Sequence, residues 1–191
     1  GDGLTRFDGH RFRPLERDGD DPTARNLGWI RALLGGRDGR LWIGTETDGL
    51  ASYDPATDRV VDHGSSAGQR PWPTIRALAE DSDGAIWAGS VGGGLQRFDP
   101  ARGRFDAWRA DGSAGALPDD RILALQLDAD GTLWIGHWRG LARLRRGATR
   151  FEPVWPAASG LGPDAAVVQA LARTDDFAAA GYVAVAPALF D

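Results

Sequence analysis

Three stretches of nearly the same sequence decide the fold: DGRLWIGT at residues 38–45, DGAIWAGS at 83–90 and DGTLWIGH at 130–137. Trp42 and Trp87 lie 45 residues apart, and Trp87 and Trp134 lie 47 apart. A self-similar pattern with a period in this range indicates a repeat architecture. We therefore read the chain as a series of copies of one structural unit.

Three more signals accompany each Asp-Gly–Trp stretch in a fixed order. An apolar tetrad precedes it: IRAL at 30–33, IRAL at 75–78 and ILAL at 122–125, with VQAL at 168–171 opening a further unit. A Gly-Leu pair follows it, at 49–50, 94–95 and 140–141. A loop and a short final strand then close the unit, as in DPATDRV from 54 and DPARGRF from 99. The opening GLTRFDGHRF at 3–12 matches the second half of such a unit.

Each unit reads as four antiparallel strands. Asp-Gly between two apolar runs is a strong hairpin signal, because Gly accepts the positive φ of a tight turn. Leu41, Trp42 and Ile43 are apolar at consecutive positions, so both faces of that strand must be covered. Sheets stacked around an axis cover both faces, and four strands per 40–50 residues are typical of propeller blades. The predicted fold is all-β: a partial β-propeller of four-stranded blades.

The repeat boundaries divide the chain into full and partial blades. Residues 1–173 hold the repeats, and 174–191 form a divergent tail that departs from the pattern. The predicted limits are a half blade at 3–14, full blades at 26–63, 71–109 and 118–154, and the first strand of a further blade at 167–173. We expect an open arc; the alternative is a closed ring of four blades, in which the apolar run at 182–186 joins the chain's first two strands.

If the chain is a propeller, the residues at the repeated positions have structural roles. Large aromatic side chains at repeat positions are usually core, so Trp42, Trp87 and Trp134 are predicted to pack blade against blade. Gly44 and Gly89, with Gly136, are predicted to permit close approach of neighbouring blades.

Composition excludes several classes of protein. Apolar residues make up 42% and charged residues 26% of the 191, which is the globular range. The net charge is −5 and the 22 basic residues, all Arg, are scattered, so no nucleic-acid-binding stripe is indicated. No run is long enough for a membrane span, and Cys is absent, which excludes disulfides and thiolate metal sites. Because Met is also absent, we expect the chain to be an excerpt of a longer protein.

The combined pattern, IxAL–DGxLWIGT–GGLxRFDPxxGxF, resembles the two-component regulator propeller repeat over residues 3–173. The resemblance implies an extracytoplasmic, periplasmic sensor domain of a hybrid histidine kinase or diguanylate cyclase, responsive to a carbohydrate or small metabolite. It also implies a non-catalytic domain, whose kinase or cyclase module lies outside this chain. By contrast, residues 177–191 show a weak similarity to the dienelactone hydrolase family, which suggests a fusion or truncation between Arg173 and Phe177.

Function in a propeller concentrates in loops at one end of the axis, because the strands are committed to packing. These loops join the second and third strands (45–48, 90–93 and 137–139) and lead into each first strand (26–29, 70–74 and 118–121). An indole beside arginine and carboxylate suits a sugar ring or an anion. The candidate ligand-binding residues are His137, Trp138, Arg139, Glu46 and Trp72. The alternative role of Trp138 and His137 is structural: covering the neighbouring blade and capping a strand.

No cofactor and no metal site is predicted. Asp81-Ser82-Asp83-Gly84 and Asp128-Ala129-Asp130-Gly131 resemble the start of a calcium loop but lack its downstream Glu, so hairpin turns are the better reading. His10, His63 and His137 are too widely spaced to suggest a ligand set.

Three functions remain open from the sequence. The first is a ligand sensor, with a small-molecule or oligosaccharide ligand, no nucleic-acid partner, no membrane contact from this segment, and either further blades of the same propeller or a homodimer partner. The second is an enzyme similar to streptogramin lyases, although no paired His acid–base arrangement can be placed. The third is a passive interaction scaffold that uses an open blade edge.

Overall fold

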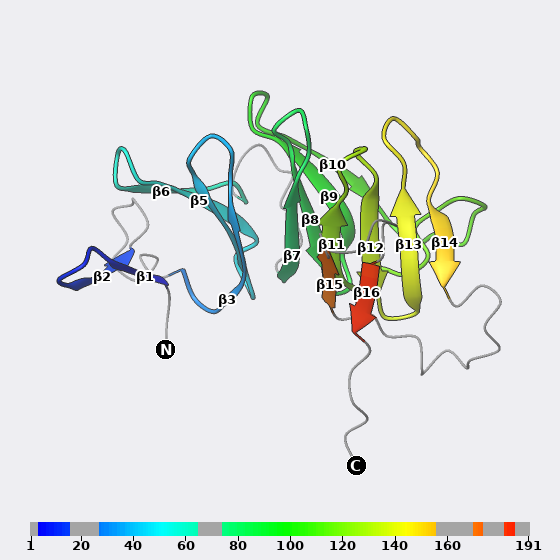
Figure 1. The fold of residues 1–191 in the computed structure, drawn as a ribbon, viewed down its shortest axis with the longest axis horizontal. Helices are drawn as coiled ribbons and strands as arrows, with labels where there is room; N and C mark the ends of the chain where they lie inside the picture. Colours follow the sequence, from blue (N-terminus) through cyan, green and yellow to red (C-terminus); the bar gives the residue numbers. More distant parts are fainter. Residues whose placement is uncertain (1–3, 16–26, 65–73, 156–169, 174–181, 186–191) are drawn as a thin grey trace, which may run out of the picture.

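The computed structural model describes residues 4–15, 27–64, 74–155, 170–173 and 182–185. These residues contain strands, turns and loops, and no helix. The strands form three four-stranded antiparallel sheets and two two-stranded ones. Figure 1 shows the sheets following one another along the chain as an arc, which confirms the predicted all-β partial propeller.

Each full blade pairs its four strands in chain order. Blade 1 comprises β3 (Ile30–Gly35), β4 (Leu41–Thr45), β5 (Leu50–Asp54) and β6 (Arg59–Asp62). Blade 2 comprises β7 (Ile75–Glu80), β8 (Ile86–Ser90), β9 (Gly94–Asp99) and β10 (Arg104–Trp108). Blade 3 comprises β11 (Ile122–Leu127), β12 (Leu133–His137), β13 (Gly140–Leu144) and β14 (Glu152–Trp155). The Asp-Gly turns join the first two strands of each blade, and their glycines have φ of +83°, +79° and +83°.

A two-stranded sheet lies at each end of the arc. One joins β1 (Leu4–Phe7) to β2 (Phe12–Leu15), and its Leu15 packs into a cluster with Ile43 and Tyr53 of blade 1. The other joins β15 (Ala170–Arg173) to β16 (Tyr182–Val185). Residues 182–185 thus pair as the second strand of a blade does, although they lie in the segment expected to depart from the pattern. The two sheets are separate, so the described strands form an open arc and not a closed ring of four blades.

Apolar side chains fill the spaces between neighbouring blades. Trp42 is buried with Leu50 of blade 1 against Ile86 and Phe98 of blade 2. Trp87 is also buried, in a cluster that includes Leu133 and Leu144 of blade 3. The predicted packing role is confirmed for these two tryptophans, whereas Trp134 is only partly buried and lies beneath the guanidinium of Arg143, at 5.9 Å.

Two glycines set the spacing of the blades. A Cβ on Gly44 would lie 2.8 Å from Ile75 Cγ2, and a Cβ on Gly89 would lie 2.4 Å from Ile122 Cγ2. Both distances are too short for real contacts, so any larger residue would push the next blade away. Close approach at these two positions was predicted from the sequence and is confirmed.

Candidate ligand-binding rim

One backbone hydrogen bond recurs at the same end of every blade, between the start of the first strand and the end of the second. The amide of Glu46 donates to Trp29 O (2.8 Å), that of Val91 to Thr74 O (3.2 Å), and that of Trp138 to Arg121 O (3.1 Å). We call these three residue pairs the rim. The backbone is the same in each blade while the side chains differ completely, as expected where a fixed scaffold carries a surface free to specialise.

In blade 3 the rim presents an indole held beside a fixed cation. Trp138 is 42% exposed, and the guanidinium of Arg121 lies 5.1 Å from its ring centroid. Arg121 donates two side-chain hydrogen bonds to Asp119, from Nε to Oδ1 (2.9 Å) and from an Nη to Oδ2 (2.7 Å). This bidentate geometry fixes the guanidinium plane. Asp119 therefore holds Arg121 in a fixed orientation beside the indole.

Asp119 stays charged although it is buried. Burial alone would raise the pKa of its carboxyl, but the hydrogen bonds from the Arg121 side chain and amide outweigh that effect, and the pKa lies below its usual value. The carboxylate is only 6% exposed. Its role is to position Arg121, and the surface offered to a ligand consists of Trp138 and Arg121.

His137 lies beneath the rim and not on it. It is 2% exposed, and its Nδ1 accepts the Arg139 amide at 3.1 Å. That bond places the ring hydrogen on Nε2, which is buried and has no hydrogen-bond partner among the described residues. Burial lowers the pKa of His137 to about 4, so the ring is neutral at neutral pH. Thr45 and Ser90 hold the equivalent positions, where their hydroxyls donate to Gly49 O and Gly94 O.

Blade 1 carries a second cluster of the same chemistry. Trp29 is 61% exposed, and the guanidinium of Arg31 lies 5.6 Å from its ring centroid. Arg31 also forms an ion pair with Glu46. A β-bulge between Ile30 and Ala32 frees Arg31 from the ladder, and bulges commonly re-aim a side chain in this way. The same bulge occurs in all three blades.

The structure brings together only some of the predicted site residues. Trp138 and Arg139 are exposed neighbours above the buried His137. Glu46 lies on blade 1, separated from Trp138 by blade 2, and it pairs with Arg31 instead of completing the Trp138 cluster. Trp72 lies outside the described residues.

Four contributors to the rim clusters were not selected as site residues from the sequence: Trp29, Arg31, Asp119 and Arg121. Asp119 and Arg121 fall in a loop that was expected to line this end, and their spacing of two residues is the available signal. The Arg121 amide also donates to Asp119 Oδ1 at 2.8 Å, which is a common local turn contact. Arg31 gives no such signal, because it occupies the variable position of a strand motif.

The described residues hold no group of three or more His, Asp or Glu side chains able to bind a metal ion. The calcium-like segments serve as turns, as predicted. Asp81 Oδ1 accepts the amides of Asp83 (2.9 Å) and Ala85 (3.0 Å).

The repeats match a known family. The two-component regulator propeller pattern matches residues 25–47, 70–92 and 116–139, which contain the first two strands of each full blade and the loop after them. The first half of each full blade therefore carries the two-component regulator propeller repeat. No curated protein matches it in sequence.

Solved structures share this propeller fold at low identity. The extracellular domain of a putative one-component system from B. thetaiotaomicron is 18% identical, with a TM-score of 0.66 over 91% of this chain and 22% of its own. The extracellular domain of a putative hybrid two-component system from the same organism is 20% identical, with a TM-score of 0.68 over 85% and 23%. Virginiamycin B lyase from Staphylococcus aureus is 12% identical, with a TM-score of 0.58 over 87% and 50%. The chain spans about a fifth of the two extracellular domains.

Proposed function

We propose that these repeats belong to the ligand-sensing part of a bacterial signalling receptor, outside the cytoplasm, and that they catalyse no reaction. The repeat family and the similarity to extracellular domains of two-component systems support this assignment. Within the described residues, no helix has the length and apolar character needed to cross a membrane. Signal output would then come from a kinase or cyclase module elsewhere in the protein.

The observation that carries the proposal is the contrast within the rim. One backbone hydrogen bond is kept in three blades, yet two of them display an exposed indole beside a guanidinium that is itself held by a carboxylate. Packing does not require this arrangement, because blade 2 has Thr74 and Val91 at the same positions.

The chemistry of the rim indicates the class of ligand. An indole face takes the apolar face of a sugar ring, and a fixed guanidinium takes hydroxyl or carboxylate oxygens in a planar, bidentate manner. We therefore propose a carbohydrate or small metabolite with a ring and polar or anionic substituents as the ligand.

A lyase function is the competing proposal, since virginiamycin B lyase has the same fold. An elimination needs a general base near the reacting proton, and a histidine is the usual choice. His137, which lies beneath the rim, is buried. Turnover of a streptogramin B in the presence of magnesium would favour the lyase over the sensor.

Binding measurements on a rim variant test the sensor proposal. Isothermal titration with neutral disaccharides and with uronic-acid disaccharides would identify a binding member of the set. For that member, Trp138→Ala should weaken binding about tenfold, equivalent to about 1.4 kcal/mol of lost stacking. Val91→Ala is the matched control, because Val91 occupies the same rim position and is also 42% exposed. Equal affinity in wild type and Trp138→Ala would remove Trp138 from the site, and binding by none of the probes would count against a carbohydrate ligand.

A further inference from the structure

A cavity of about 320 Å³ lies between blades 2 and 3. It is lined by the turn between β7 and β8, the turn between β11 and β12, and the loop that leaves β13. These turns lie at the opposite end of the strands from the rim. The cavity is therefore separate from the rim, and a ligand bound here would not touch the rim.

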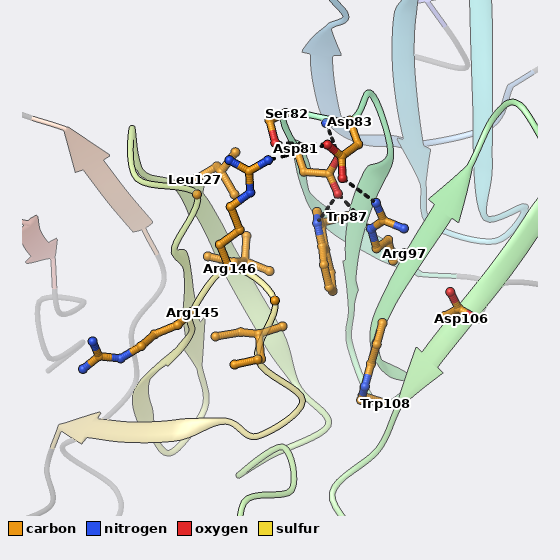
Figure 2. A pocket seen from close by; sticks show the side chains of 15 residues that line it. Asp81, Ser82, Asp83, Trp87, Arg97, Asp106, Trp108, Leu127, Arg145 and Arg146 are labelled. Carbon is orange, nitrogen blue, oxygen red and sulfur yellow. Dashed lines mark hydrogen bonds and ion pairs between the residues drawn. The ribbon is translucent and has the colours of Figure 1, made fainter.

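The walls of the cavity form an apolar slot. On blade 2, the indole of Trp87 stacks with that of Trp108, with ring centroids 5.2 Å apart. On blade 3, the facing wall is made by Leu127, Leu133 and Leu144. Figure 2 shows Trp87 standing between Arg97 on one side and Leu127 and Arg146 on the other. One face of the Trp87 indole is thus directed toward blade 3.

The equivalent slot between blades 1 and 2 is filled by the protein itself. There Trp42 takes the place of Trp87, and Phe98 takes the place of Leu144. The Phe98 ring meets Trp42 edge-on at 5.8 Å and packs against His63 at 4.6 Å. Between blades 2 and 3, Leu144 occupies this position, and the phenyl ring of that cluster, Phe151, packs edge-on against Trp108 at 6.4 Å instead. Trp108, although larger than the equivalent His63, stacks on Trp87 and forms part of the wall without filling the space.

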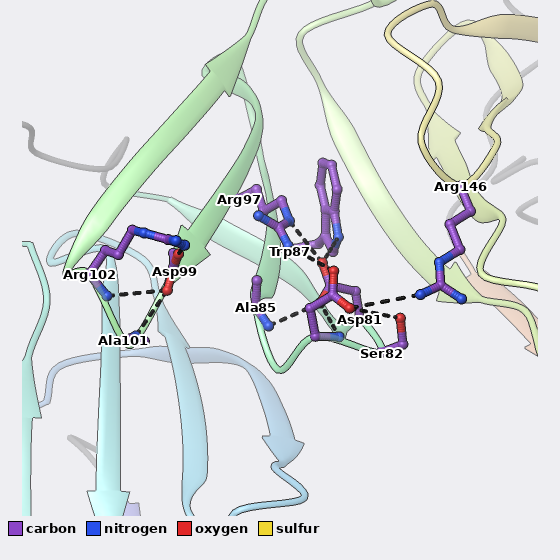
Figure 3. Close-up of polar contacts among 10 residues, drawn as sticks. Asp81, Ser82, Ala85, Trp87, Arg97, Asp99, Ala101, Arg102 and Arg146 are labelled. Atoms are coloured by element: carbon purple, nitrogen blue, oxygen red, sulfur yellow. Dashed lines mark hydrogen bonds and ion pairs between the residues drawn. The ribbon is translucent and has the colours of Figure 1, made fainter.

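The mouth of the slot is polar, and its charges are already balanced. Asp81 Oδ2 accepts Arg97 Nε (2.8 Å) and Trp87 Nε1 (3.1 Å), as Figure 3 shows. Asp83 is 70% exposed and lies 3.8 Å from both Arg97 and Arg146. Because acids and arginines alternate around the mouth, it favours a neutral group that both donates and accepts a hydrogen bond, and it does not favour an ion.

We propose that this slot is a binding site for a small neutral aromatic compound bearing a hydroxyl group. The ring lies between the Trp87 indole and the leucines of blade 3, in the position that Phe98 fills in the neighbouring interface. The hydroxyl lies at the mouth, where Asp83 accepts its hydrogen and Arg146 donates to its oxygen.

Phenol is the test probe, with cyclohexanol as a non-planar probe of similar size and methyl α-glucopyranoside as a sugar. Titration of the 191-residue chain, followed by the methyl NMR signals of its leucines, should show binding of phenol with shifts in Leu133 and Leu144. Cyclohexanol should bind at least tenfold more weakly, because it cannot lie flat on the indole. Binding of the sugar in preference to phenol, or shifts confined to leucines elsewhere, would overturn the proposal.

Two reciprocal variants locate the site. Leu144→Phe places a phenyl ring in the slot and should reduce phenol affinity at least tenfold. Phe98→Leu copies the open slot into the interface of blades 1 and 2 and should add a second binding event, detected in the methyl signals of Leu34 and Leu78. Undiminished phenol binding by Leu144→Phe would refute the site. Trp138→Ala alters only the rim and should leave phenol affinity unchanged, so that failure of one proposal leaves the other intact.

Discussion

The two interfaces between full blades are formed by the same repeat positions, but different side chains occupy those positions and pack differently. Between blades 1 and 2, Trp42, His63 and Phe98 meet in one aromatic cluster, with Phe105 behind Phe98 at 4.6 Å. Between blades 2 and 3, Trp87 stacks with Trp108, and both Trp87 and Leu144 line a cavity. The repeated tryptophan and glycine therefore fix the spacing of the blades. The residue on the third strand of the next blade, Phe98 or Leu144, decides whether the space between the blades is filled.

The polar side chains at the two interfaces also differ. In blade 1 the interface is closed by a hydrogen bond between Ser52 Oγ and His63 Nε2, at 2.9 Å. In blade 2 the equivalent of Ser52 is Arg97, which pairs with Asp81 at 2.8 Å. Gly36 holds the position of Asp81 in blade 1, where a Cβ would lie only 2.9 Å from Trp42 Nε1. The first interface is thus filled by aromatic side chains and has an ion pair at this end, between Arg37 and Glu80. The second borders a cavity and has four charged side chains at its mouth: Asp81, Asp83, Arg97 and Arg146.

Removal of the central indole provides the largest test of this comparison. Trp42→Ala should lower the free energy of unfolding by about 3–5 kcal/mol, because it leaves a new void in a filled cluster. Trp87→Ala should cost about 1 kcal/mol less, since Trp87 already borders a cavity and loses fewer contacts. Urea unfolding followed by far-UV circular dichroism would measure both. Equal losses, or a larger loss for Trp87→Ala, would mean that the two interfaces are equally well packed.

Acid should weaken the first interface through His63. Burial lowers the pKa of His63 to about 4 and that of His137 to about 4, both below the usual 6.5. The unfolded chain therefore takes up these protons first as the pH falls, and stability present above pH 6.5 is lost as the pH falls toward 4. Each group should contribute a loss of about 2 kcal/mol between pH 7 and pH 5.

Two variants divide this loss of stability between His63 at the first interface and His137 beneath the rim. His63→Gln keeps a hydrogen-bonding group beside Ser52 but cannot titrate, so it should remove about half of the loss between pH 7 and pH 5. His137→Ser, which copies Ser90 of blade 2, should remove the other half. Thermal unfolding at a series of pH values would measure both slopes. A slope unaffected by His63→Gln would show that acid does not act on the interface of blades 1 and 2.

The repeat made the fold predictable. The Asp-Gly turns, the consecutive apolar residues around Trp42 and the glycines at 44 and 89 recur in register, so strand order, hairpin positions and blade packing followed from one pattern. The sites were less predictable because they depend on the residues that do not repeat. Arg121 and Asp119 lie in a loop that was expected to line this end, but the approach of Arg121 to Trp138 depends on a backbone hydrogen bond between two strands.

The slot between blades 2 and 3 could not be predicted from the repeat pattern. Leu144 and Phe98 are both large and apolar, and both fit the repeat, so neither departs from it. The difference appears only in the structure, where Phe98 contacts the Trp42 ring and Leu144 borders a cavity beside Trp87. The motif specifies which positions are apolar, and the volume of each side chain then decides where a cavity forms.

Exchange of Phe98 and Leu144 should give the smallest effect among these tests of the difference between the two interfaces. Phe98→Leu removes a ring from a filled cluster and should lower the free energy of unfolding by about 1 kcal/mol. Leu144→Phe adds a ring beside a cavity of about 320 Å³ and should raise it by about 0.5–1 kcal/mol, as cavity-filling substitutions commonly do. The double variant moves the cavity from one interface to the other and should return stability close to that of the wild type, because the two sites lie in different interfaces and their effects add. A destabilising Leu144→Phe would show that the wall of the slot cannot accept a ring, and that the difference between the interfaces lies in the spacing of the blades and not in the side chain at this position.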